Sequence, residues 1–159
     1  METNNAKENG AGWVSNMAQM VAALECDYDR LHELDDARPL EDADEIAEYA
    51  ELNAAATIDG DLMDDADAAR ERIIESPLSV QVRGDWYSPG TMEKPDASEF
   101  EILLSTGGPA LRIRGELDQH NQPSRAWLEY QDWGTGWIQY FEVEQDTLLS
   151  FASCFYFGE

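Results

Sequence analysis

The sequence predicts an α+β fold: about three N-terminal helices, then an antiparallel sheet of about five strands and a C-terminal helix. Before Pro77 the apolar residues recur every three or four positions, and after it they recur every second position. Sixteen aromatic side chains and a 43% hydrophobic content supply a core of the size that one ordinary domain of 159 residues needs. We expect a flexible N-terminus over 1–12 and a single domain over 13–159, divided into an acidic helical part (13–76) and a sheet part (77–159).

The first predicted helix covers 13–34, with Ser15 as a plausible N-cap. Its apolar residues are spaced by four, three, four and three positions, which places them on one face: Met17, Val21, Leu24, Tyr28 and Leu31. Such a face predicts burial along one side of the helix.

Two more helices are predicted, over 41–57 and 62–75, with a turn at 58–61 between them and Ser76–Pro77 ending the second. The helix over 41–57 is expected to turn its small apolar residues inward, where they permit close packing: Ala43, Ile46, Ala47, Ala50 and Ala54.

Beyond Pro77, alternation predicts five strands, over 78–82, 100–104, 110–117, 125–130 and 135–143, with a turn at 120–124 between the third and the fourth. Gly107–Gly108–Pro109 and Trp133–Gly134 are the expected tight turns, and 84–98 is an expected loop. A strongly apolar helix is expected from Glu144 to 157. Consecutive strands joined by short turns predict an antiparallel meander.

The charge of the chain is its most unusual property: 34 acidic residues oppose ten basic ones, for a formal net charge of −24. Residues 1–76 carry −16 and residues 77–159 carry −8, and between Glu25 and Asp67 there are 17 acids and two bases. This asymmetry argues against a uniform halophilic surface, and solubility alone is the remaining simple explanation. Nucleic acid and anionic membranes would be repelled, so a basic protein surface is the favoured partner.

No motif indicates catalysis, a cofactor or a metal. His32 and His120 have no metal-ligand spacing, and Cys26 and Cys154 lie far apart and outside any nucleophile signature. The acids of 59–65 fail the calcium-loop pattern, because Met63 stands at the fifth position. With no signal peptide and no run of about 18 apolar residues, we expect a reduced, cytoplasmic, non-enzymatic protein without cofactor.

The acidic residues themselves are the candidate binding site. Glu41, Asp44, Glu48 and Glu51 are spaced by three, four and three positions, which predicts an outward row opposite the alanines. Like charges four apart cost a helix about 0.2–0.5 kcal/mol each, which suggests a partner that relieves the cost. Crowding of this kind also predicts raised carboxylate pKa values. The predicted partner-binding residues are Asp35, Asp36, Glu41, Asp44, Glu45, Glu48, Glu51, Asp61, Asp64 and Asp65.

Rows of fixed carboxylates can enter a Lys/Arg groove that normally holds phosphates, so the sequence predicts a nucleic-acid mimic. The acidic helices and the segment Trp127–Trp137 (WLEYQDWGTGW) resemble small accessory proteins of bacterial phages and plasmids, among which are anti-restriction and anti-CRISPR proteins. That resemblance implies an inhibitor of a DNA- or RNA-binding defence complex in the cytoplasm of a bacterial host. Two alternatives stay open: an immunity protein that neutralises a basic nuclease toxin, and an acid/base enzyme using a carboxylate pair.

Overall fold

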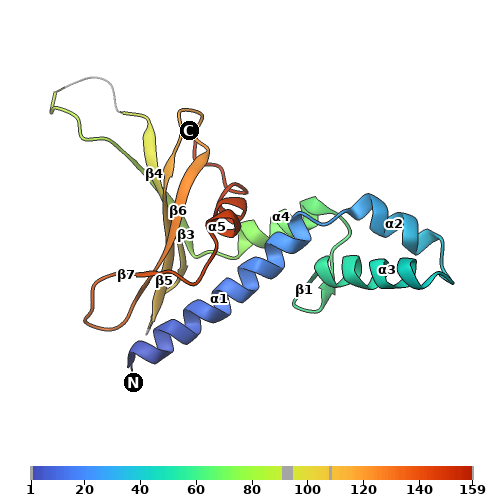
Figure 1. Cartoon of the computed structure of the whole chain (residues 1–159). Coiled ribbons are helices and arrows are strands. Elements are labelled where there is room, and N and C mark those ends of the chain that lie inside the picture. Colours follow the sequence, from blue (N-terminus) through green and yellow to red (C-terminus); the bar gives the residue numbers. More distant parts are fainter. Residues whose placement is uncertain (1, 91–94, 108, 159) are drawn as a thin grey trace. The chain divides into compact units, whose positions relative to one another are not determined.

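The computed structural model describes residues 2–90, 95–107 and 109–158, with side chains from residue 6 onward, and confirms the α+β class (Figure 1). In the described part, four helices and a small hairpin precede a five-stranded sheet and a fifth helix. Gly108, in one of the predicted turns, and residues 91–94 of the predicted loop lie outside the described residues.

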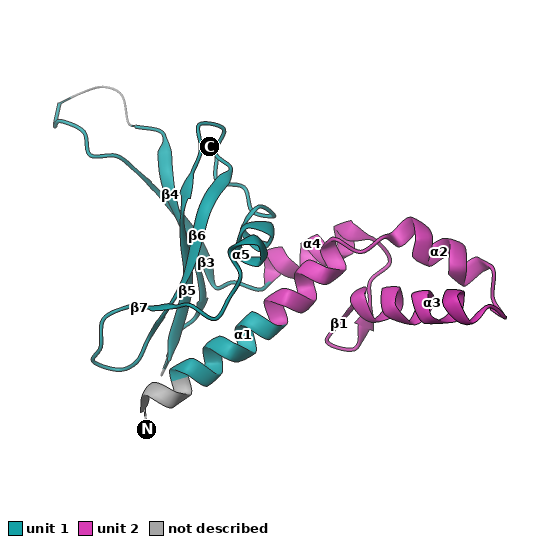
Figure 2. Cartoon of the chain, viewed as in Figure 1, with its two compact units in different colours: residues 1–15, 76–159 teal, residues 16–75 magenta. Residues whose placement is uncertain are grey.

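The chain forms two compact units (Figure 2). The helical unit is 16–75, and the sheet unit combines 1–15 with 76–159. Helix α1 (Glu2–Leu24) is continuous through the boundary between them. Residues 2–12, which we expected to be flexible, are helical in the structure, and Ser15 lies inside this helix rather than at its N-cap.

The sheet is the predicted antiparallel meander, in the order β3-β4-β5-β6-β7. Its strands are β3 (Ser79–Gly84), β4 (Ala97–Ser105), β5 (Ala110–Leu117), β6 (Pro123–Gln131) and β7 (Ile138–Tyr140). The predicted last strand over 135–143 shrinks to three residues, because the chain turns at Asp132–Thr135 and again after Tyr140.

One face of this sheet, here called the inner face, is apolar and covered. Phe100, Ile102 and Leu104 of β4 alternate with outward polar residues, and all three are at most 2% exposed. Helix α5 (Gln145–Ala152) packs against β6 and buries Leu148, Phe151 and Ala152. The closing helix thus exists as predicted but ends at Ala152, after which Phe157 stacks on Phe100 with ring centroids 4.7 Å apart.

The N-terminal part of α1 belongs to the same core. An added Cβ on Gly10 would lie 3.2 Å from the ring of Tyr140, so the helix packs closely on β7 at this glycine. Asn9 Nδ2 donates a hydrogen bond to Ser105 Oγ on β4 at 3.1 Å, and Ala6 is 1% exposed. These contacts explain why the first residues are ordered as a helix although their sequence is polar.

In the helical unit the predicted helix over 13–34 is two helices. Helix α1 ends at Leu24, and α2 (Tyr28–Asp36) begins after Asp27, whose carboxylate accepts a hydrogen bond from the backbone N–H of Arg30 at 3.1 Å. Tyr28 donates a hydrogen bond to the carbonyl of Ala23 at 2.6 Å and fixes the break. An acidic N-cap competes successfully with continuation of the helix.

The rest of the unit is α3 (Ala43–Ala55), a hairpin of β1 (Thr57–Ile58) and β2 (Asp61–Leu62), and α4 (Ala66–Glu75). The predicted turn at 58–61 is confirmed: Asp59 and Gly60 have φ of 49° and 85°, which join the two short strands. The end of α4 before Ser76–Pro77 is also confirmed, although this helix starts four residues later than predicted.

The orientation of α3 differs from the prediction. The five residues expected to face inward, Ala43, Ile46, Ala47, Ala50 and Ala54, are all exposed. Toward α2 the helix instead presents Glu48 and Tyr49, which bond to Arg30 and Asp35. Tyr49 offers more apolar surface than alanine does, and Arg30 and Asp35 of α2 supply polar partners, so this face packs better than the alanine stripe.

We predict that Gly115→Ala lowers the free energy of unfolding by about 1–3 kcal/mol. The new methyl group would meet the carbonyl oxygen of Arg125 at 2.2 Å and the ring of Phe100 at 2.4 Å. Chemical denaturation of both proteins measures the difference. Gly12→Ala is the matched control, because it has no neighbour within 4 Å, and there the helix should gain up to about 1 kcal/mol. Equal stability of the two variants would contradict the packing described for Gly115.

Candidate functional site

The helical unit carries the charge excess. Residues 16–75 contain 19 carboxylates and four arginines, a formal net charge of −15 in 60 residues. Each of the four arginines is already paired with carboxylates of the same unit: Arg30 with Glu33 and Glu48, Arg38 with Asp35, Arg70 with Asp67 and Arg72 with Asp61. The unit thus keeps a formal net charge of −15 although each of its arginines is already engaged in an internal ion pair.

The ten predicted binding residues all belong to this unit but have different surroundings. Asp35, Glu48 and Asp61 are held in ion pairs, and Asp65 Oδ1 accepts the backbone N–H of Ala68 at 2.8 Å. The other six make no side-chain hydrogen bond or ion pair with any described residue, and we call them the acidic surface: Asp36, Glu41, Asp44, Glu45, Glu51 and Asp64. Glu45 is half-buried and the other five are exposed.

The predicted row of four carboxylates on one helix does not form. Glu41 precedes α3, because Asp42 is the N-cap and its Oδ1 accepts the backbone N–H of Asp44 at 3.0 Å. Glu48 is turned toward Arg30 on α2, with Nε–Oε1 and NH2–Oε2 distances of 2.9 and 3.1 Å. Of the row, Asp44 and Glu51 remain as exposed carboxylates on α3 without an ion pair to a described residue.

The expected rise in carboxylate pKa is reversed at Glu48. Hydrogen bonds from Arg30 favour the ionised carboxylate and hold the pKa of Glu48 below its ordinary value, against a smaller opposing effect of desolvation. A lowered folded-state pKa means that this pair contributes to stability at neutral pH and loses that contribution as pH falls through the pKa.

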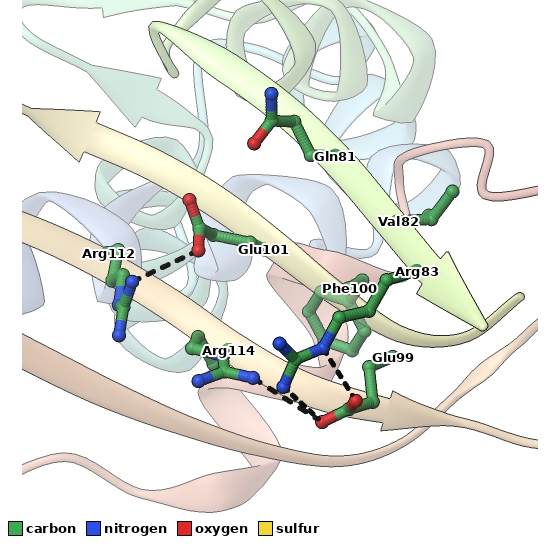
Figure 3. Close-up of a pocket in the computed structure, with 8 residues that line it drawn as sticks. All are labelled: Gln81, Val82, Arg83, Glu99, Phe100, Glu101, Arg112 and Arg114. Atoms are coloured by element: carbon green, nitrogen blue, oxygen red, sulfur yellow. Dashed lines mark hydrogen bonds and ion pairs between the residues drawn. The ribbon is translucent and has the colours of Figure 1, made fainter. Parts of the chain in front are cut away.

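A second polar surface lies on the outer face of the sheet and was missed by sequence reasoning. Glu99 lies between Arg83 and Arg114 (Figure 3). Arg112 forms ion pairs with both Glu101 and Glu129. A pocket of about 260 Å³ lies among these side chains. It is lined by Arg83, Glu99, Glu101, Arg112 and Arg114, together with Gln81, Val82 and Phe100 (Figure 3). The signal in the sequence was the alternate spacing of Glu99 and Glu101 and of Arg112 and Arg114, which puts each pair on one face.

Arg112 is the centre of this network. Its side chain is 15% exposed, pairs with Glu101 at 3.1 Å and with Glu129 at 2.8 Å, and lies 3.9 Å from the ring centroid of Trp137. Arg83 is bound to Glu99 through Nε at 2.7 Å, which lowers the pKa of that carboxyl. Since the arginines are matched by glutamates, this face is a cross-strand ion-pair network rather than an open anion site.

The aromatic side chains of 127–141 divide between two environments. Tyr130 and Tyr140 are buried on the inner face and meet edge-on at 6.3 Å, whereas Trp127 and Trp137 are half-buried beside arginines. Trp133 and Phe141 are 74% and 78% exposed. The aromatic side chains of this segment therefore do not lie on one continuous surface.

Within the described residues, no group of three or more His, Cys, Asp or Glu side chains is arranged to hold a metal ion. His32 Nε2 lies 2.8 Å from the carbonyl oxygen of Asp64, and Cys26 and Cys154 form no disulfide with a described residue. The described helices include none with the length and apolar character that crossing a bilayer requires. Comparisons with protein-family models, with curated proteins and with solved structures find no match to this chain.

We predict that Arg30→Gln raises the pKa of Glu48, because the variant loses the hydrogen bonds that favour the ionised form. Titration of the side-chain carboxyl carbons by NMR between acid and neutral pH measures the change. The carboxyl of Asp118 serves as an internal reference in the sheet unit, since backbone N–H groups of His120 and Gln122 lower its pKa independently of Arg30. An unchanged Glu48 titration would show that the pair does not form in solution.

We also predict that Arg112→Met lowers the free energy of unfolding by about 2 kcal/mol, because Glu101 and Glu129 are left half-buried without their shared cation. The matched variant is Arg125→Met, whose guanidinium is exposed and 5.6 Å from the Trp127 ring, and it should change stability by less than about 0.5 kcal/mol. Urea denaturation compares the three proteins. Similar losses in both variants would count against a special role for Arg112.

Proposed function

We propose that the chain is a non-enzymatic binding protein whose helical unit occupies a basic groove of a DNA- or RNA-binding protein. The observation that carries this proposal is the charge excess of that unit: 19 carboxylates, four arginines, and every arginine already paired internally. Such a surface attracts a partner rich in Lys and Arg and repels nucleic acid itself.

The exposure of the carboxylates supports the same proposal. Five of the six members of the acidic surface are exposed, and they come from α2, from α3, from the segment between these helices and from the segment before α4. A partner can therefore reach them without unfolding the unit. A basic groove would contribute the cations that the unit lacks, and displaced counterions would add to the binding free energy, as they do for nucleic acid.

Within this proposal, a bacterial defence complex that binds DNA or RNA is the proposed target, in line with the resemblance to phage and plasmid accessory proteins. An immunity protein against a basic nuclease toxin would use the same charge complementarity. The two differ in the partner recovered: a nucleic-acid-guided or restriction complex in the first case, and a small nuclease toxin in the second.

The test compares two variants with the same change in net charge. One neutralises Asp36, Glu41, Asp44 and Glu51 in the helical unit, and the other neutralises Asp96, Glu116, Glu144 and Asp146, four exposed carboxylates of the sheet unit. Immobilised wild-type and variant proteins are exposed to extract of the source organism at low and high salt. The recovered protein is then tested for binding to a labelled nucleic-acid duplex by fluorescence anisotropy.

We predict that the first variant loses at least about tenfold in affinity for the recovered protein, a change of about 1.4 kcal/mol, whereas the second stays within about threefold. High salt should weaken binding, and wild-type protein should displace the duplex from the recovered protein. An equal loss of affinity in both variants would show that binding depends only on the net charge of the chain and not on the acidic surface. Recovery of a protein that does not bind nucleic acid would overturn the proposal.

A further inference from the structure

The edge strand β3 has an uncovered apolar side. Val80 and Val82 pair with Ile102 and Phe100 of β4 and point to the same inner face, yet they are 37% and 46% exposed, whereas the two β4 residues are at most 2% exposed. Leu78, next to the strand, is 61% exposed. The cover of the core thus stops one strand before the edge of the sheet.

The backbone of β3 is also available on its outer edge. β3 pairs with β4 alone, and no described residue forms a strand on its other side, so half of its N–H and C=O groups point away from the sheet. Natural edge strands usually carry a lysine, a proline or an inward-pointing charge that prevents pairing with another strand. Ser79–Gly84 has none of these on its inner side, and its only irregularity is the register shift at Arg83/Gly84.

Charge favours this strand as a contact between two copies. The sheet unit has 15 acids and six bases, a formal net charge of −9, but Ser79–Gly84 contains no acid and one arginine. Two highly acidic chains repel each other least where neither presents a carboxylate on the meeting strand. A contact through β3 satisfies that condition.

We propose that two copies of this chain associate through β3, antiparallel about a twofold axis at Gln81, to form one continuous sheet. In this register Val80 of each copy faces Val82 of the other on the inner face. On the outer face Gln81 meets Gln81, and Arg83 meets Ser79. No like charges are directly opposed, and the apolar residues of both strands stay on one face, as a self-complementary twofold contact requires.

A shift by one residue would place the valines of one copy on the polar face of the other, so it is disfavoured. The axis at Gln81 also gives pairing along the whole strand, with Leu78 opposite Gly84, which leaves space for the leucine side chain. The association is independent of the acidic surface, whose residues all lie in the helical unit.

The first experiment is sedimentation velocity across a concentration series at low and high salt. The wild-type chain should dimerise reversibly, and more strongly at high salt, because salt screens the repulsion between two chains of net charge −24. The binding of a basic partner has the opposite salt dependence, so failure of one proposal is distinguishable from failure of the other. A chain that stays monomeric at all concentrations in high salt overturns the dimer.

The variant Val82→Glu places a carboxylate in the apolar contact and should weaken dimerisation at least about tenfold. Its matched control is Ile138→Glu on β7, the other edge of the sheet, where the side chain lies on the same inner face and is 42% exposed. The control should dimerise like the wild type. Equal effects of the two changes would overturn the assignment to β3.

A cysteine at the axis tests the register without relying on destabilisation. Opposed residues of antiparallel strands have Cα atoms about 4.5–5.5 Å apart, within the range that a disulfide spans. Gln81→Cys should therefore give a covalent dimer under mild oxidation, whereas the wild type, with Cys26 and Cys154 only, and Gln139→Cys on β7 should not. Absence of the Gln81→Cys dimer, or its formation equally in Gln139→Cys, overturns the register.

Discussion

The excess of 34 carboxylates over ten cations is the main electrostatic constraint on this structure, because it decides where each cation is placed. Eight of those cations are arginines, four in each unit, and they form different kinds of ion pairs in the two units. In the sheet unit, arginines of neighbouring strands alternate with glutamates and stabilise the outer face of the sheet. In the helical unit each arginine forms a local ion pair, such as the one joining α2 to α3, and the unit still keeps a surplus of negative charge.

The class and order of the fold could be predicted because hydrophobic periodicity changes at Pro77 and turns containing Gly, Pro or Asn separate the strands clearly. The ends of the helices were harder to predict. The break between α1 and α2 depends on two hydrogen bonds: the backbone N–H of Arg30 donates to the Asp27 carboxylate, and the Tyr28 hydroxyl donates to the carbonyl of Ala23. The apolar periodicity of the sequence continues through this break and therefore does not reveal it. The N-terminal helix was missed because its polar residues are ordered by contacts with Ser105 and Tyr140, far away in the sequence.

Composition identifies the acidic segment as the candidate site, but the orientation of its side chains could not be predicted from helical spacing. Spacing places Ala47 and Glu48 on different faces of α3 and cannot say which face is inside. The structure resolves that choice through Arg30, whose pairing with Glu48 turns this residue toward α2, while the alanines are exposed. Likewise, the network around Arg112 depends on strand register, which joins residues 101, 112 and 129 from three strands.

The sheet unit is assembled from both ends of the chain, and this affects how it can form during synthesis. Asn9 forms a hydrogen bond with Ser105, and Gly10 packs against Tyr140. The first part of α1 therefore cannot make these contacts until roughly 130 further residues have been synthesised, which takes on the order of 10 s at ordinary translation rates. The segment 16–75 emerges whole well before then. A nascent chain would accordingly display its complete acidic part while the other part still lacks its last strands.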